Sequence, residues 1–318
     1  MSKVLVTGGA GFIGSNLVEA LLKDKSVELV RVLDNLATGY YKNIEEFVGN
    51  SRFEFLEGDI RDIDTCKKAA EGMDFISHQA ALGSVPRSIA DPITSNAVNI
   101  DGTLNMMVAA KEQNVKRFVF AASSSTYGDS EGLPKVEDKI GNPLSPYAVT
   151  KLVNELYAGV FQRAYGLEYI GLRYFNVFGP KQDPSGAYAA VIPLFFKAAI
   201  EKKSPVINGD GSNSRDFTYV DNAVEANILS LFTKRKEAVN QVYNVACGER
   251  TSLNELWTYI NEITSADIGP IHGRAREGDI PHSLADISKA QSLLDYKASI
   301  KITEGLERAF QWYKNQNK

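Results

Sequence analysis

The run Gly8-Gly9-Ala10-Gly11-Phe12-Ile13-Gly14 lies between two segments of different periodicity. Residues 3–7 are short and apolar and predict a β-strand, whereas residues 12–23 are amphipathic and predict a helix. Such segments keep alternating along the first half of the chain. Further strands are predicted at 27–34, 53–56, 74–77, 117–122 and 168–173, and long helices at 93–113 and 147–164. This alternation predicts an α/β fold with a Rossmann-like, doubly wound parallel sheet.

The glycines of this run have separate roles in a turn that binds a dinucleotide. Gly8 permits a tight turn, Gly11 lets the backbone approach a pyrophosphate, and Gly14 lets the helix pack closely on the strand. The start of the helix, at Phe12 and Ile13, then offers free N–H groups and the positive end of the helix dipole to the phosphates. A glycine turn without ligand is the alternative, but the placement between strand and helix favours the dinucleotide.

Beyond residue 176 the alternation loosens, and loops rich in Gly, Pro, Ser and Asp separate shorter elements. Helices are predicted at 189–201, 221–232, 253–263 and 303–313. We therefore expect a nucleotide-binding domain at 1–175 and a smaller, substrate-binding lobe at 176–318. The chain is expected to interleave at this boundary.

The composition excludes several classes of protein. The 318 residues are 44% hydrophobic and 23% charged, which argues against disorder, collagen or a coiled coil as the main architecture. A net charge of -4 argues against nucleic acid or an anionic membrane as a principal partner. Cys66 and Cys247 lack the spacing of a disulfide framework or a metal site, so we expect buried thiols and no metal. With no signal peptide and no apolar run near ~20 residues, we expect a soluble cytoplasmic protein.

Asp34 ends the second predicted strand, where a carboxylate accepts hydrogen bonds from both hydroxyls of an adenosine ribose. The same charge repels a 2′-phosphate, and no arginine follows directly to bind one, so NAD is favoured over NADP. Asp59 and Ile60 follow the third predicted strand and are candidates to hold the adenine. Gly58-Asp59 is also an ordinary turn pair, which remains the alternative there.

Tyr147 and Lys151 lie four residues apart in a predicted helix that Ser145 caps and Pro146 opens. Both side chains therefore share one helix face. We expect the ammonium group and a nicotinamide cation to lower the pKa of Tyr147 from its usual ~10 toward neutrality, making it a general base or acid. Lys151 would also bind the nicotinamide ribose. The alternative is a tyrosine and a surface lysine on an amphipathic helix.

The run Ser123-Ser124-Ser125-Thr126-Tyr127-Gly128 follows the predicted strand 117–122. Parallel sheets bind their ligands at the carboxyl ends of their strands. A hydroxyl at this place can bridge a substrate hydroxyl and Tyr147. A serine-rich loop without function is the alternative.

Together these motifs resemble the extended short-chain dehydrogenase/reductase family over nearly the whole chain. Within it, the chain looks most like nucleotide-sugar 4-epimerases, and especially bacterial UDP-N-acetylglucosamine 4-epimerases of surface-polysaccharide pathways. The resemblance implies that Tyr147 removes the proton from the sugar 4-hydroxyl and that Ser123 is the family's catalytic Ser/Thr. It also implies that hydride passes from C4 to tightly bound NAD, and that the 4-keto sugar turns and takes the hydride on its other face.

The resemblance further implies two sets of binding residues. For NAD they are Gly8, Gly11, Phe12, Ile13, Gly14, Asp34, Asn35, Asp59, Ile60, Gln79, Ala80, Ala81, Asn99, Tyr147, Lys151 and Tyr174. For the UDP-sugar they are Gly83, Ser84, Ser123, Ser124, Ser125, Tyr147, Asn176, Ala190, Val191, Asn208, Arg215, Arg276, Asp279 and Ser283. In this set the two arginines bind phosphate, because the guanidinium fork suits a pyrophosphate, and Asp279 binds ribose.

Departures from related enzymes narrow the chemistry. Dehydratases of the resembled family carry Asp-Glu after the catalytic residue, and decarboxylases carry a nearby Glu, where this chain has Ser124 and Ser125. Ser283 stands where epimerases restricted to non-acetylated sugars carry tyrosine, so it leaves space for a 2-acetamido group. The small residues Gly83, Ser84 and Ala190 favour the same substrate, although Ser283 as a plain loop residue is the alternative.

Other functions remain open from the sequence. One is a related nucleotide-sugar oxidoreductase, or a 4-epimerase of UDP-hexuronic acid or of UDP-glucose only. Another is a non-catalytic, NAD-sensing regulatory protein, although such proteins often lose the Tyr-Lys pair. The resemblance also implies a homodimer through helices 93–113 and 147–164. Leu152, Leu156 and Val160 have helical spacing there, but that stripe would equally suit the core.

Overall fold

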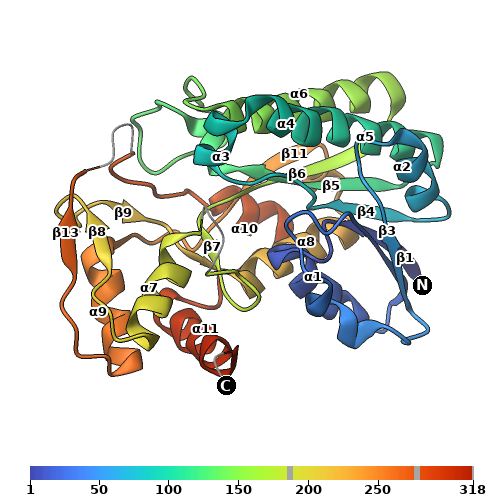
Figure 1. Ribbon diagram of the computed structural model, residues 1–318. Coiled ribbons are helices and arrows are strands. Elements are labelled where there is room, and N and C mark those ends of the chain that lie inside the picture. The colour runs from blue at the N-terminus through green and yellow to red at the C-terminus, as the bar shows by residue number, and fades with distance from the viewer. Residues whose placement is uncertain (185–188, 276–279, 317–318) are drawn as a thin grey trace.

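The computed structural model of this chain describes residues 1–184, 189–275 and 280–316. Among them, seven parallel strands form the central sheet in the order β11-β6-β5-β4-β1-β2-β3 (Figure 1). Their bounds are β1 Ser2–Thr7, β2 Val27–Asp34, β3 Phe53–Glu57, β4 Phe75–His78, β5 Arg117–Ser123, β6 Glu168–Tyr174 and β11 Gln241–Val245. The strand order reverses between β1 and β4, and this is the place where doubly wound sheets bind ligands.

Helices cover both faces of the sheet because alternate strand residues are apolar toward each face. On one face, α1 (Phe12–Lys23) and α8 (Val220–Phe232) pack in a core with Val4 and Val6 of β1. On the other, α2 (Ile63–Ala70), α5 (Gly102–Glu112) and α6 (Pro146–Tyr165) pack in a core with Leu5. The sheet is therefore buried on both faces, and the loops that follow the carboxyl ends of its strands are available to form a site.

The predicted doubly wound sheet is confirmed, and helix 12–23 and strand 27–34 have the predicted bounds. The predicted helix 93–113 is three successive helical segments: α4 Pro92–Asn96, a π-helical segment Ala97–Asp101 and α5. Sequence reasoning did not predict α2, α3 (Val85–Ala90) or β11. Because β11 pairs with β6 and α8 packs under the sheet, the second half of the chain interleaves with the first.

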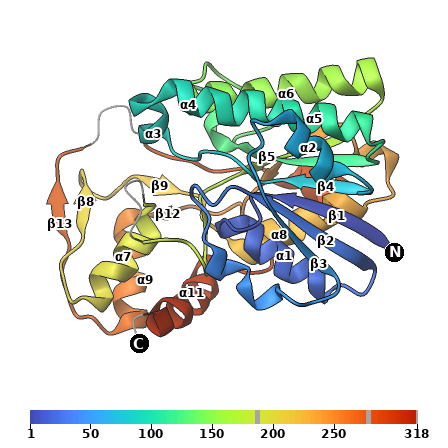
Figure 2. The same cartoon turned by 45° about the vertical axis from the view of Figure 1, so that its right-hand side comes forward.

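The remaining elements form a smaller lobe beyond the carboxyl ends of the strands (Figures 1 and 2). Its helices are α7 Val191–Ile200, α9 Leu253–Thr264, α10 Ser288–Leu294 and α11 Ile302–Gln316. Short strand pairs join them: β7 Val177–Phe178 with β10 Thr218–Tyr219, β8 Val206–Asn208 with β13 Ile271–Gly273, and β9 Ser214–Arg215 with β12 Thr251–Ser252. Edge-on aromatic contact between Phe195 and Trp257 packs α7 on α9.

Three broader features concern the described part of the chain. No helix there is both long enough and apolar enough to cross a bilayer. Cys66 and Cys247 are free thiols and both are buried. The same residues contain no group of three or more His, Cys, Asp or Glu arranged to hold a metal ion.

Candidate active site

The glycine turn brings two backbones together at the reversal point between β1 and β4. Gly8 has a φ of 68°, and a Cβ on it would lie 2.7 Å from the backbone nitrogen of Ala80. A Cβ on Gly14 would lie 2.1 Å from the carbonyl oxygen of Gly8. Among the described residues, no side chain caps α1 at Gly11, and no acidic residue stands in its first turn. The free N–H groups at this helix start therefore suit an anion.

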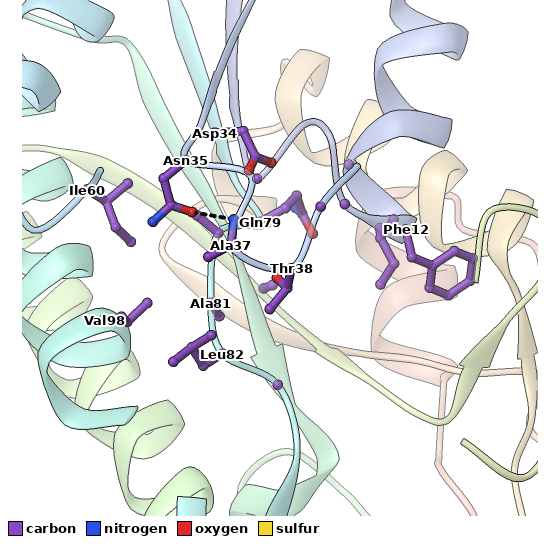
Figure 3. Close-up of a pocket in the computed structure, with 18 of the residues that line it drawn as sticks. Phe12, Asp34, Asn35, Ala37, Thr38, Ile60, Gln79, Ala81, Leu82 and Val98 are labelled. Atoms are coloured by element: carbon purple, nitrogen blue, oxygen red, sulfur yellow. Dashed lines mark hydrogen bonds between the residues drawn. The ribbon is translucent and has the colours of Figure 1, made fainter. Parts of the chain in front are cut away.

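A cavity of about 520 Å³ opens at this point (Figure 3). Its lining includes most of the sequence-predicted cofactor residues, namely Gly8, Gly11, Phe12, Ile13, Gly14, Asp34, Asn35, Asp59, Ile60, Gln79, Ala80, Ala81, Tyr147, Lys151 and Tyr174. In Figure 3, Asp34 lies at the end of β2 and Asn35, Ala37 and Thr38 on the loop that follows. Ile60, Val98 and Leu82 give the cavity an apolar side. The dashed contact there is the 3.1 Å hydrogen bond from the Ala37 N–H to Asn35 Oδ1.

Asp34 is fixed by the turn that it faces. Its Oδ2 accepts the Ala10 N–H at 2.9 Å and its Oδ1 accepts the Leu36 N–H at 2.8 Å. Burial raises the pKa of Asp34, and these two hydrogen bonds lower it in part. Each carboxylate oxygen keeps a further lone pair for a ligand hydroxyl.

Asp59 is paired with a residue that sequence reasoning missed. Arg61 Nη2 lies 2.6 Å from Asp59 Oδ2, and Asn35 Nδ2 donates to the same oxygen at 2.9 Å. Hydrogen bonding to Arg61 above all lowers the pKa of Asp59 to about 2. Arg61 also lines the cavity, so the negative charge of Asp59 at this edge is balanced by an arginine.

Several other lining residues were not predicted: Leu33, Ala37, Thr38, Gly39, Gly58, Leu82, Thr94, Val98, Ala121, Ala122 and Val177. The loop 37–39 had a usable signal, since Gly39 is a typical turn residue and lies four residues after Asn35. Gly39 packs so closely that a Cβ on it would lie 2.8 Å from the carbonyl carbon of Ala10. Leu82 and Val98 had no such signal, because only the fold brings them to the cavity.

Asn99 stands behind the cavity wall and is not among the described residues that line it. It is fully buried, and its side chain accepts the Leu82 N–H at 2.8 Å and donates to the Leu82 carbonyl at 3.1 Å. Asn99 therefore holds the backbone of a residue that lines the cavity. The expected direct contact of Asn99 with the cofactor stays a prediction.

Gln79 and Tyr174 are held together at the floor of the cavity. The Tyr174 hydroxyl donates to Gln79 Oε1 at 3.0 Å and accepts from Asn227 Nδ2 at 2.7 Å. Burial raises the pKa of Tyr174 to about 12, so this hydroxyl keeps its proton.

Ser123, Tyr147 and Lys151 meet in the same cavity although they come from two elements. Ser123 ends β5, while Tyr147 and Lys151 lie one turn apart at the start of α6. Ser145 caps this helix and Pro146 occupies its first turn, as predicted. Because Lys151 is only 3% exposed, the alternative of a surface lysine is excluded.

The helix start that carries Tyr147 is also tied to α3. The backbone N–H of Tyr147 donates to the hydroxyl of Ser88 at 3.0 Å, and Ser88 is fully buried. This contact satisfies a helix N–H that has no partner within the helix. It also ties the backbone at the start of α6 to α3.

Lys151 and Tyr147 are both pushed toward their neutral forms by burial. Lys151 Nζ donates to the Ala121 carbonyl at 2.8 Å, and burial lowers the pKa of Lys151 to about 8. Burial raises the pKa of Tyr147, and a hydrogen bond with Ser123 only partly offsets this. In the protein by itself, Lys151 Nζ is directed to a carbonyl and desolvation holds the pKa of Tyr147 above its usual value. The predicted fall toward neutrality includes the charge of a nicotinamide cation and stays a prediction for the protein with its cofactor bound.

The predicted substrate residues near the cavity differ in what they do. Gly83 and Asn176 line it. Ser84 instead caps α3 by accepting the Arg87 N–H at 3.2 Å. Ser125 donates from its hydroxyl to Ser123 Oγ at 2.9 Å and so orients that hydroxyl, and Ser124 begins the short 3-10 turn that follows β5.

The other predicted substrate residues belong to the smaller lobe and do not line the cavity among its described residues. Arg215 and Ser283 are brought close together, since the Ser283 N–H donates to the Ser214 carbonyl at 3.0 Å. Asn208 ends β8, while Ala190 and Val191 stand at the start of α7. The predicted residues Arg276 and Asp279 lie outside the described residues.

The arrangement fits a dinucleotide. The glycine cradle leaves no room for a Cβ, the start of α1 offers free N–H groups, and Asp34 keeps acceptor capacity at the end of β2. These three features match pyrophosphate and ribose at the places where a doubly wound sheet binds them.

The burial of Lys151 predicts a measurable stability effect. Its pKa of about 8 in the folded protein lies below the ~10.4 of an unfolded chain, so the folded state binds this proton more weakly. The resulting penalty is complete at pH 7 and is relieved as the pH rises from about 8 to ~10. Lys151→Met should therefore raise the melting temperature at pH 7, and the gain should shrink at pH 10.

The measurement is thermal unfolding of protein stripped of nucleotide, because a bound ligand would itself raise stability. Lys197→Met, at an exposed lysine of α7, is the matched control and should change the melting temperature little at either pH. A lower melting temperature for Lys151→Met at pH 7 would contradict the assigned penalty.

Comparison with known proteins agrees with this geometry. The family model described as "NAD dependent epimerase/dehydratase family" matches residues 4–246. A putative UDP-glucose 4-epimerase of Methanocaldococcus jannaschii is 39% identical over 99% of both chains. A solved UDP-N-acetylglucosamine 4-epimerase of Methanobrevibacter ruminantium, in complex with UDP-N-acetylmuramic acid, is 41% identical over 99% of both chains with a TM-score of 0.90. A UDP-glucuronic acid 4-epimerase of Bacillus cereus, solved with UDP-glucuronic acid and NAD, is 33% identical over 99% of both chains with a TM-score of 0.91. This chain therefore belongs to the NAD-dependent epimerase/dehydratase family.

Proposed function

We propose that this protein is an NAD-dependent 4-epimerase that interconverts UDP-N-acetylglucosamine and UDP-N-acetylgalactosamine, with UDP-glucose and UDP-galactose as further candidate substrates. The observation that carries the proposal is the meeting of Ser123, Tyr147 and Lys151 in the cavity of the glycine turn. The similarity to 4-epimerases over 99% of the chain supports the reaction class.

Each catalytic side chain has a task that its surroundings support. Tyr147 takes the proton of the sugar 4-hydroxyl and later returns it. Ser123, oriented by Ser125, hydrogen-bonds the same sugar oxygen and the tyrosine. Lys151, whose pKa is about 8, lies with Nζ 5.8 Å from the centre of the Tyr147 ring and stabilises the deprotonated tyrosine by its charge. Bound NAD supplies the group that accepts and returns hydride.

The cofactor and substrate residues expected from the sequence are part of this proposal. The helix start at Phe12 and Ile13 would hold the pyrophosphate of NAD, and Asp34 its adenosine ribose. Arg215 and Arg276 would bind the diphosphate of the UDP-sugar, and Asp279 its ribose. Asn176 would bind the diphosphate or the sugar. A site of this kind grips UDP and leaves the hexose free to turn over between its two faces.

Small side chains support the acetylated substrate. Ser283, Gly83 and Ala190 leave room where a 2-acetamido group would lie, and the 41% identical UDP-N-acetylglucosamine 4-epimerase favours the same class. The 33% identical UDP-glucuronic acid 4-epimerase makes a hexuronic acid the second candidate. We also propose a cytoplasmic location and a role in supplying sugars for polysaccharide synthesis.

A homodimer through α4 and α6 is the proposed assembly. These helices contact each other along the outer side of the molecule (Figure 1). Leu156 and Val160 of α6 are 62% and 45% exposed, and Ile93 of α4 is 81% exposed. The apolar stripe at these positions is therefore not part of the core, and burying it against a second copy would remove it from water.

The reaction is tested by proton NMR of UDP-N-acetylglucosamine with purified protein and no added cofactor. We expect new anomeric signals of UDP-N-acetylgalactosamine that settle at a fixed ratio, since the cofactor is recycled. Parallel tubes contain UDP-glucose and UDP-glucuronic acid. Conversion of UDP-glucuronic acid alone would replace the proposed substrate with the second candidate, and no conversion in any tube, even with NAD added, would contradict the epimerase.

Tyr147→Phe is the control variant for this assay. It removes one hydroxyl and should lower turnover by roughly 10²–10⁴-fold. Near-normal turnover would remove Tyr147 from the role of base.

The role of Ser283 is tested by filling the space that it leaves. Ser283→Tyr should lower conversion of UDP-N-acetylglucosamine by roughly 10²-fold or more while sparing UDP-glucose, because the ring would collide with the acetamido group. Ser283→Ala keeps the space and should retain both activities. Equal loss on both substrates in Ser283→Tyr would mean that the position is structural.

The dimer is tested by light scattering after gel filtration. Leu156→Glu places a charge on the exposed stripe of α6 and should give a monomer. Val206→Glu, at a 60% exposed valine on β8, is the control and should leave the dimer intact. A wild-type protein that elutes as a monomer at micromolar concentration would contradict this assembly.

A further inference from the structure

His78 lies beside the place where the backbones of Gly8 and Ala80 approach each other most closely. It ends β4, directly before the segment 79–82, and is 3% exposed. Its Nδ1 lies 2.8 Å from the hydroxyl of Thr7, which precedes Gly8 on β1. Its Nε2 lies 3.0 Å from the hydroxyl of Thr103 on α5. The ring therefore bridges the glycine turn and the helix layer.

The neighbours of the ring decide which nitrogen carries its proton. The Thr103 hydroxyl donates to the Asn99 carbonyl at 2.7 Å, so its single hydrogen is used. Thr103 Oγ1 can then only accept from the ring, which places the proton on Nε2. The bare Nδ1 accepts from the Thr7 hydroxyl, and Thr7 Oγ1 in turn accepts the Ala80 N–H at 3.3 Å.

This assignment gives a hydrogen-bonded chain with one direction. It runs from the Ala80 N–H through Thr7, His78 and Thr103 to the carbonyl of Asn99. Hydrogen bonds that point the same way polarise and strengthen one another in a dry interior. A second proton on the ring would meet the hydrogen of Thr7 and break the chain at its centre. Burial and the charge of Lys151 lower the pKa of His78 to about 3, which keeps the ring neutral.

The chain continues to the helix that carries the catalytic pair. Asn99 Nδ2 donates to the Thr150 hydroxyl at 3.2 Å, and Thr150 donates to the Tyr147 carbonyl at 2.7 Å. Asn154, on the next turn of α6, donates to Thr103 Oγ1 at 3.3 Å. The same network thus contacts the glycine turn, the Leu82 backbone that Asn99 holds, and the first turns of α6.

We propose that His78, held as its neutral Nε2–H tautomer, is a positioning residue that sets the NAD cradle in register with the helix of Tyr147 and Lys151. It touches neither cofactor nor substrate and acts through Thr7, Thr103 and Asn99. This proposal rests on the proposed function only in assuming that the cavity binds NAD. Both of its tests are made without a sugar substrate. An enzyme inactive on every UDP-sugar would therefore leave this proposal standing.

The first test is nitrogen-15 NMR of the histidine rings. The sequence has three histidines, so His272→Asn and His282→Asn identify the signals of His78 by elimination. We expect a protonated Nε2 and an unprotonated Nδ1, unchanged between pH 5 and pH 8, as the neutral tautomer requires. A proton on Nδ1, or titration of the ring in this range, would overturn the assignment.

The second test is NAD affinity of nucleotide-stripped protein, measured by calorimetry. Thr7→Val and Thr103→Val keep the side-chain shape and each removes one hydroxyl from the chain. Each should weaken NAD binding by about tenfold, as for a lost hydrogen bond that strands a buried partner, while UDP affinity stays unchanged. Ser230→Ala is the control, because the Ser230 hydroxyl is also fully buried but, among the described residues, donates within its own helix to the Ala226 carbonyl.

The comparison separates positioning from general stability. Loss of NAD affinity in both threonine variants, with UDP affinity intact and Ser230→Ala unaffected, supports the proposal. A lowered melting temperature with wild-type NAD affinity in both variants would reduce His78 to a structural residue and overturn it.

Discussion

The site depends on one close approach of backbone to backbone. At Gly8 the chain leaves β1 so near to the start of segment 79–82 that a single methyl group would lie 2.7 Å from the Ala80 nitrogen. This approach places the start of α1, the end of β2 and the carboxyl end of β4 around one cavity. Gly14 and Gly39 repeat the same constraint on either side, since each packs its backbone directly on the turn. These glycines lose conformational freedom on folding, and their close packing forms a turn whose N–H groups can bind an anion.

Burial then sets the chemistry of the residues that the cradle faces. Desolvation disfavours the charged forms of both residues, so it lowers the pKa of Lys151 and raises the pKa of Tyr147. The proton on Lys151 is held more weakly than usual, and the proton on Tyr147 is held more strongly. Further positive charge in the site would weaken the hold on the tyrosine proton. The protein alone therefore keeps the tyrosine protonated, and this favours a site in which proton removal is coupled to a bound cation.

Local sequence patterns predicted much of the fold, but they could not predict the polar contacts of the interior. Helix 12–23 and strand 27–34 could be bounded from the sequence because their periodicity is strong and a glycine run or a turn flanks them. The strand β11 was missed because Gln241 and Asn244 interrupt its apolar pattern, and Asn244 is satisfied only by partners far along the chain, such as the Lys135 carbonyl. The contact of Asn99 with the Leu82 backbone was not predicted for a related reason. It forms only because the fold places the π-helical segment beside that loop. The glycines, Asp34, Tyr147 and Lys151 were accessible because each occupies a fixed place relative to a strand end or a helix start.

The place of β11 in the chain has a consequence for how the protein forms. β6 pairs with β5 on one side, and its other side stays an open edge until residues 241–245 are available. Ile170 and Leu172 of β6 are fully buried in the finished sheet, so that edge is apolar as well as unpaired. While residues 175–240 are being synthesised, the outer side of β6 therefore has no partner strand and can pair with other chains. The seventh strand of the sheet can therefore pair only after about the first half of residues 176–318 has been synthesised.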